Sequence, residues 1–146
     1  MSNAALAANY LFTGTLLEER LRDQVPGLPV EGIEQMAQAV DAQDKRRAVA
    51  YVMWGGDRFP DNAGGGEATV VYQQWLVWLR VVNASAADKD ARSGAAGPAL
   101  SALHKALAGW KPEGCLRGLK RVAGPRPNYQ PASALYPLAF EIQLHL

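Results

Sequence analysis

The run from Val70 to Asn83, VVYQQWLVWLRVVN, predicts one long β-strand that is apolar on both faces. Because neighbouring side chains of a strand point to opposite sides, Trp75 falls on one face, and Tyr72 and Trp78 fall on the other. At roughly 3.3 Å per residue the strand would reach about 45 Å, whereas a usual strand has about 5 to 6 residues. Neither face suits contact with water, so this strand limits the folds open to the chain.

The second apolar face is difficult to bury within 146 residues, which is the size of one domain. Helices of the same chain can cover one face, but the face with Tyr72 and Trp78 needs a second layer or a neighbouring subunit. We therefore expect the protein to assemble, and we take Tyr72, Trp78 and Arg80 as candidate interface residues on the strand. Residues 1–4 look like the remnant of a cloning tag, and residues 5–146 are expected to form the single domain.

Composition narrows the class of protein. The formal net charge of +1 gives no overall electrostatic preference for nucleic acid, membranes or acidic substrates. Cys115 is the single cysteine, so no disulfide can form within the chain, and with His104 and His145 it does not complete a structural zinc site. The sequence shows neither the basic start of a signal peptide nor the roughly 20 consecutive apolar residues of a membrane span. We expect synthesis in the cytoplasm and no membrane partner.

Hydrophobic periodicity predicts the remaining elements. In chain order they are an amphipathic helix that ends before Pro26, an extended segment at 28–30, a short helix at 33–40, a strand at 48–54, a helix that starts at Pro98 and ends at Gly109, a weaker strand at 115–123 and a strand at 135–146. We expect Trp54, Trp75 and Trp110 in the core. This order predicts an α+β fold with a mixed or antiparallel sheet of about four to five strands and helices packed on one face.

The segment from Gly55 to Thr69, GGDRFPDNAGGGEAT, is predicted to be a long loop because it is rich in glycine. It lacks the GxxxxGK[ST] pattern, and a strand rather than a helix follows it, so it does not indicate a nucleotide site. We take Asp57, Arg58 and Phe59 in this loop as further candidate interface residues.

No pattern predicts catalysis, a cofactor or a metal. Neither His104 nor His145 belongs to a sequence motif that pairs a histidine with a nucleophile, and the sequence has no GxSxG elbow. The aspartates around Asp57 do not form a calcium loop. We therefore expect no catalytic residue, no cofactor and no metal ligand.

Basic residues gather toward the C-terminal third of the chain, at Arg117, Lys120, Arg121 and Arg126. If residues 115–123 form a strand, Arg117 and Arg121 share one of its faces and Lys120 lies on the other. The patch could contact a phosphate backbone, which predicts salt-sensitive binding to DNA. Because neither a known motif nor an excess of basic residues accompanies it, we do not expect specific nucleic-acid binding.

Several segments occur in a recognisable order. They are VPG at Val25 to Gly27, then VEGIEQMAQAV, WGGDRFPDNAGGG, QQWLVWLRVVNA, LAGWKPEG, GPRP at Gly124 to Pro127, and YPLAFEIQL near the end. In this order and spacing the chain resembles the phage tail terminator proteins of the Mu-like prophage type, which are related in fold to the lambda minor tail protein U. The resemblance covers nearly the whole chain after the first four residues.

The resemblance implies a structural role in virion assembly and no enzymatic step. Proteins of this type form a ring, typically a hexamer, that docks on the end of the tail tube, stops its polymerisation and offers a surface for head joining. The implied partners are other copies of the chain, the tail-tube protein and the head-tail connector. The implied locations are the bacterial cytoplasm during assembly and the virion tail.

Other readings of the sequence remain open. The chain could be another virion structural protein, such as a head-tail connector or a tail-tube subunit. It could also be a small ligand-binding or enzymatic α+β domain in which Gly55 to Thr69 closes over a site. Closed rings favour the terminator, filaments favour the tube subunit, and monomers favour the enzyme.

Overall fold

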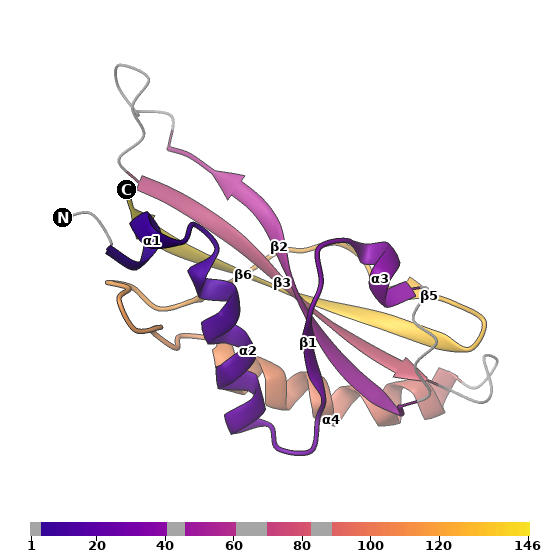
Figure 1. Cartoon of the computed structure of the whole chain (residues 1–146). Coiled ribbons are helices and arrows are strands. Elements are labelled where there is room, and N and C mark those ends of the chain that lie inside the picture. The colour runs from indigo at the N-terminus through magenta and orange to yellow at the C-terminus, as the bar shows by residue number, and fades with distance from the viewer. Residues whose placement is uncertain (1–3, 41–45, 61–69, 83–88) are drawn as a thin grey trace.

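The computed structural model describes residues 4–40, 46–60, 70–82 and 89–146 (Figure 1). The elements are α1 (Ala4–Ala8), α2 (Phe12–Gln24), β1 (Val30–Gly32), α3 (Met36–Val40), β2 (Ala48–Arg58), β3 (Val70–Val82), α4 (Lys89–Leu107), β4 (Lys120–Val122), β5 (Asn128–Tyr129) and β6 (Ser133–His145). None of the helices within these ranges is long and apolar enough to cross a membrane.

The strands form one six-stranded mixed sheet in the order β1-β2-β3-β6-β4, and β5 also pairs with β6. β1 runs parallel to β2, and every other described pairing is antiparallel. The sequence predictions of an α+β fold and of a long strand at Val70 are confirmed, and β3 lies at the centre of the sheet. The strand count exceeds the prediction because β5 forms between the strands predicted at 115–123 and 135–146.

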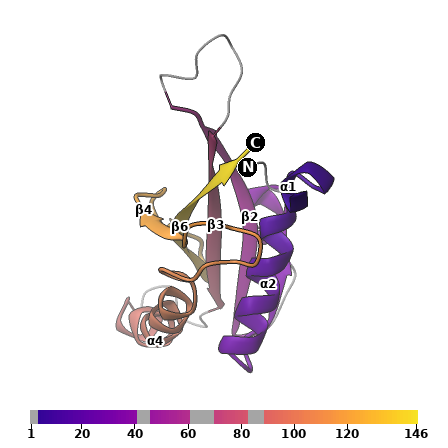
Figure 2. The same cartoon turned by 90° about the vertical axis from the view of Figure 1, so that its left-hand side faces the viewer.

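Helices α2 and α4 cover one face of the sheet (Figure 2). Their buried leucines, Leu17, Leu21, Leu103 and Leu107, pack in one cluster with the side chains of β3 and β6 that point toward them. On β6 these are Leu138, Phe140, Ile142 and Leu144, which is the alternation that the sequence predicts for the last strand. This cluster is the main core of the domain.

Helix α3 covers part of the opposite face. Ala39 of α3 is fully buried and packs with Trp78, Leu76 and Tyr51 of the sheet in a second apolar cluster. Only 3% of Trp78 is exposed. The prediction that all helices pack on one face is therefore wrong, as is the expectation that the face with Trp78 lacks cover. A helix of five residues suffices because the small side chain of Ala39 lets the helix approach the strands closely.

The start of α4 differs from the prediction, because the helix begins at Lys89 and Pro98 lies inside it. A proline lacks a backbone N–H and disfavours the helical conformation of the residue before it, so the sequence favours a boundary there. Ala96 is buried in the main core, and this packing supports the turn before Pro98. The predicted end is confirmed, since α4 stops at Leu107 and Gly109 has a φ of +77°.

Candidate assembly interface

Strand β2 does not end at Trp54 as predicted but continues to Arg58, past a shift in its pairing with β3 between Trp54 and Gly56. Two glycines make this bulge feasible. Gly56 has a φ of +107°, and a Cβ added to Gly55 would lie 2.9 Å from Oε1 of Gln74. The sequence Gly-Gly therefore marks a bulge within a strand rather than the start of a loop.

The bulge changes the position of three candidate interface residues. Asp57 and Arg58 belong to β2, so the prediction that they lie in a loop is wrong, whereas Phe59 follows directly after the strand. Residues 61–69 of that predicted loop lie outside the described residues. Asp57 pairs with Gln73 and Arg58 with Tyr72, which places their side chains on opposite faces of the sheet.

Asp57 connects the strand end to the N-terminal segment. Tyr10, between α1 and α2, donates its hydroxyl proton to Oδ2 of Asp57 at 2.5 Å, and Nε1 of Trp54 donates to Oδ1 at 3.3 Å. The rings of Tyr10 and Trp54 meet edge to face with centroids 6.3 Å apart. Burial raises the pKa of Tyr10, and the hydrogen bond to Asp57 and its negative charge raise it further. The neutral hydroxyl is therefore held in place as a donor.

A buried glutamine supports this contact from within the sheet. Gln73 is fully buried among apolar side chains, yet Nε2 of Gln73 donates to the backbone oxygen of Tyr10 at 2.8 Å. Its Oε1 accepts from Nε1 of Trp75 at 3.2 Å. Since both ends of the amide are paired, Gln73 fixes the position of Tyr10 without leaving an unsatisfied group.

Arg58 ties three strands together on the opposite face. Its Nη2 lies 2.8 Å from Oε1 of Glu141 on β6, and its Nε donates to Oε2 at 3.4 Å. The guanidinium carbon lies 4.2 Å from the ring centroid of Tyr72 on β3. The Arg58 side chain is 60% exposed although Glu141 is only 15% exposed. The charged end of Arg58 is thus held in a defined position and still faces solvent.

The six candidate interface residues fall into two groups. Tyr72, Asp57, Arg58 and Phe59 lie together at the β2–β3 end of the sheet, while Trp78 and Arg80 are buried further along β3, with 3% and 7% exposed. The sequence analysis missed Tyr10 and Glu141 at this end and expected Trp54 in the core, although Trp54 is 40% exposed. A signal existed for Glu141, because it is the one acidic side chain in the alternating pattern of the last strand.

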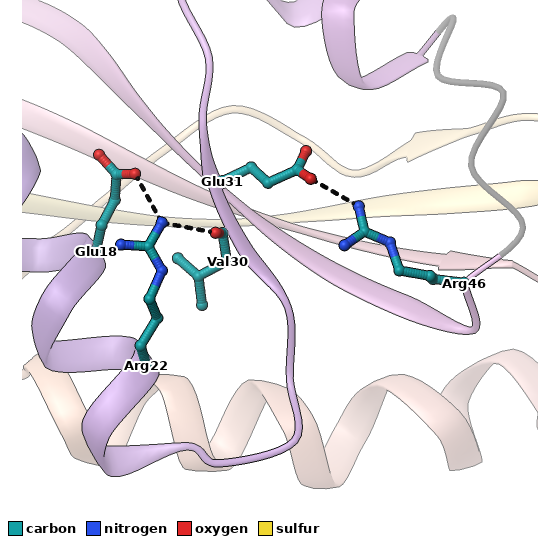
Figure 3. Close-up of polar contacts among 5 residues, drawn as sticks. All are labelled: Glu18, Arg22, Val30, Glu31 and Arg46. Atoms are coloured by element: carbon teal, nitrogen blue, oxygen red, sulfur yellow. Dashed lines mark hydrogen bonds and ion pairs between the residues drawn. The ribbon is translucent and has the colours of Figure 1, made fainter.

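The β1 edge of the sheet carries two ion pairs (Figure 3). Nη2 of Arg22 lies 3.3 Å from Oε1 of Glu18 and donates to the backbone oxygen of Val30 at 2.9 Å. Nη2 of Arg46 lies 2.8 Å from Oε1 of Glu31. At least one side chain of each pair is exposed to solvent, so the pairs contribute little to the stability of the fold.

A cavity of about 640 Å³ opens beside this edge. Its lining includes Leu11, Glu18, Ile33, Glu34, Trp54 and Trp75. β1 pairs with β2 only as far as Val52, and no described strand pairs with the outer edge of β2 beyond that residue. The cavity thus adjoins an open stretch of sheet edge.

The predicted basic patch lies at the opposite edge of the sheet. Lys120 and Arg121 belong to β4, Arg117 precedes it, Arg126 lies between β4 and β5, and all four are exposed. The prediction that Arg117 and Arg121 share a strand face is wrong, because β4 begins only at Lys120. Nη1 of Arg121 donates to the backbone oxygens of Val122 and of Ala139 on β6, and its guanidinium lies 5.9 Å from the ring centroid of Phe140.

Other candidate chemistry is sparse. Among the residues that the structure describes, no group of three or more His, Cys, Asp and Glu side chains could hold a metal ion. Burial raises the pKa of the Cys115 thiol, so the reactive thiolate form is disfavoured. The expected absence of catalytic residues and cofactors stays a prediction.

The fold and these surfaces define a small α+β domain in which β1 and β4 are the outermost described strands of a mixed sheet. The family described as "Phage tail terminator protein" matches residues 7–146, and the chain belongs to this family. The resemblance seen in the sequence is thereby confirmed at the level of the family, and the Mu-like subtype stays a prediction. The family consists of structural virion proteins rather than enzymes, and it assigns the chain to the phage tail and to tail completion, with contacts to tail and head components.

No curated protein matches the chain. Ten chains of solved structures do match. One of them is 15% identical in sequence, aligns with 100% of this chain and 97% of its own length, and has a TM-score of 0.51. At this identity the likeness supports the fold alone.

Proposed function

We propose that the protein forms a closed ring, typically a hexamer, that docks on the end of the tail tube. The ring stops the addition of tube subunits, and its other side joins the head connector. The family supports the role, and the braced β2–β3 end of the sheet is the observation that carries the docking step. In Figure 1 this end lies opposite β5, at one extremity of the sheet.

The β2–β3 end has the composition of an interface centre. Trp54 and Arg58 of β2 and Phe59 after it are all exposed. Arginine and aromatic residues are enriched where protein contacts are strongest. Contacts on both faces of β2 hold this end in one geometry before binding. Such preorganisation lowers the entropy lost when the tube docks.

The experiment is complementation of a tail assembly reaction that lacks its terminator. Arg58→Ala combined with Phe59→Ala should leave the ring intact but allow tubes to grow past their normal length in electron micrographs. Arg117→Ala, an exposed arginine outside this end, serves as the control and should restore normal length. Normal tails with the double variant would show that docking uses another surface.

The nearest alternative is a tail-tube subunit. Tube subunits add to one another end to end without limit, whereas the contacts between terminator subunits close into a ring after a full turn. Wild-type protein alone at micromolar concentration should therefore give rings and no filaments in negative-stain images. Filaments would favour the tube subunit.

A further inference from the structure

Rows of paired residues connect the two edges of the sheet. Arg121 of β4 pairs with Phe140 of β6, Phe140 pairs with Trp75 of β3, and Trp75 pairs with Trp54 of β2. The next row runs in the same way from Lys120 to Gly56 of β2. β4 on one edge and the open stretch of β2 on the other edge therefore lie at the same level along the strands.

The two edges also differ in outline at this level. On one side β1 covers β2 from Ala50 to Val52 and stops before Trp54, which leaves a notch. On the other side β4 stands out as the last strand of the sheet. The notch and the protruding strand thus have complementary outlines at one height.

Strand direction suits a contact between copies. β2 and β6 are both antiparallel to β3, and β4 is antiparallel to β6, so β4 and β2 run in opposite directions. If a rotation about an axis along the strands relates two copies, β4 of one lies antiparallel to β2 of the next. Because the two edges lie at the same height, one copy need not be translated along that axis relative to the next. Repeating this contact by rotation alone closes a ring instead of a spiral.

Charge distinguishes β4 from the cavity at the other edge of the sheet. On the face covered by α2, Arg121 lies over Phe140 at one edge, and Glu18 lines the cavity at the other. Lys120 lies at the same edge as Arg121 but on the opposite face, and Glu34, which precedes α3, lines the same cavity as Glu18. Among the described residues neither Lys120 nor Glu34 forms an ion pair, although Glu141 lies directly opposite Lys120 on β6, and the ion pair of Glu18 with the exposed Arg22 is weak.

We propose that β4 of one copy docks in the notch beside β2 of the next copy and extends the sheet from subunit to subunit. Arg121 and Lys120 of one copy then meet Glu18 and Glu34 of the next copy, and opposite charges attract across the contact. The backbone groups of β2 beyond Val52 gain a strand partner. This inference rests on the proposed ring and names the contact that builds it.

The test uses two variants with like-charged edges. Lys120→Glu with Arg121→Glu makes both edges acidic, and Glu18→Lys with Glu34→Lys makes both edges basic. Each variant alone should fall apart to the 15.7 kDa monomer in native mass spectrometry at micromolar concentration. Mixed in equal amounts they should form rings in which the two variants alternate, which also shows that both are folded.

A matched control carries the same charge change elsewhere. Lys105→Glu with Lys111→Glu alters two exposed lysines that belong to neither edge, and this variant should keep the ring. Amide hydrogen exchange gives a second readout, because residues 53–58 should exchange more slowly in the wild-type ring than in the acidic-edge monomer.

The outcomes separate this proposal from the proposed function. A ring that survives Lys120→Glu with Arg121→Glu would overturn the edge contact and leave the terminator ring standing. A mixture of the two variants that stays monomeric would also overturn the edge contact. A wild-type protein that closes no ring, alone or on tubes, would overturn both proposals.

Discussion

Tyr72 and Trp78 lie on the same face of the same strand, but different structures cover them. α3 buries Trp78 in an apolar cluster, whereas Tyr72 is half-buried under the guanidinium of Arg58, which itself faces solvent. The domain therefore hides one half of this face with its own helix and stabilises the other half with polar contacts. The second half is the one that we propose for contacts with other virion proteins.

Trp78→Asp should have the largest effect. It would place a charge without a partner in a site that is 3% exposed and remove a large apolar side chain, at a cost of more than about 4 kcal/mol. Little folded protein should remain, as measured by urea denaturation with circular dichroism. Tyr72→Asp at the half-buried position is the control and should cost about 1 kcal/mol. Equal unfolding free energies of the two variants would contradict the difference in burial between the Trp78 half and the Tyr72 half of this face.

Gly56→Ala should have the next largest effect. At a φ of +107° an alanine is strained, so unfolding free energy should fall by about 1 to 2 kcal/mol and the bulge that positions Arg58 should be disturbed. Gly94→Ala in α4 is the matched control, because no atom crowds that position and alanine favours helix, so it should stabilise by about 0.5 to 1 kcal/mol. A change of the same sign in the unfolding free energy of both variants would argue against a strained glycine at the bulge.

Arg58→Ala should cost little stability but much function. The ion pair with Glu141 is partly exposed and the contact with Tyr72 is local, so their loss should lower unfolding free energy by about 1 kcal/mol. Denaturant midpoints give the stability, and binding to purified tube ends gives the function. Normal binding by this variant would mean that the polar half of the face is not the docking surface.

The smallest effect concerns pH. The pKa of Tyr10 is raised in the folded state, first by burial and then by Asp57, so the neutral form is favoured on folding. Its contribution to stability is complete below the ordinary tyrosine pKa of about 10 and is lost as pH rises through the higher folded pKa. Tyr10→Phe should therefore lose less stability than wild type between neutral pH and the alkaline range. Parallel stability profiles in this range would exclude the Tyr10–Asp57 bond as the cause.

The long strands were predictable because their patterns are strong and extended. β3 appears at Val70 and β6 keeps its alternation from Leu138 to Leu144. The cover of Trp78 was not predictable, because periodicity indicates the short helix at 33–40 but not the face of the sheet on which it packs.

The candidate site was only partly predictable. The sequence indicated Asp57, Arg58 and Phe59 as candidates, which stays a prediction. Because Gly55 and Gly56 mark loops and bulges alike, the sequence could not show that β2 continues. The partners of these residues, Tyr10 and Glu141, are far away in the chain and become neighbours only through the sheet register. The sequence could not show that β4 and the notch lie at the same height along the strands. Their heights depend on the registers of three successive pairings, β4 with β6, β6 with β3 and β3 with β2.

The most direct test of the account is the growth of tail tubes from purified tube subunits with and without this protein, followed by electron microscopy. The account predicts that rings occupy tube ends and that mean tube length stops increasing once the protein is added. Tubes that keep growing at the same rate, with no ring at their ends, would contradict it.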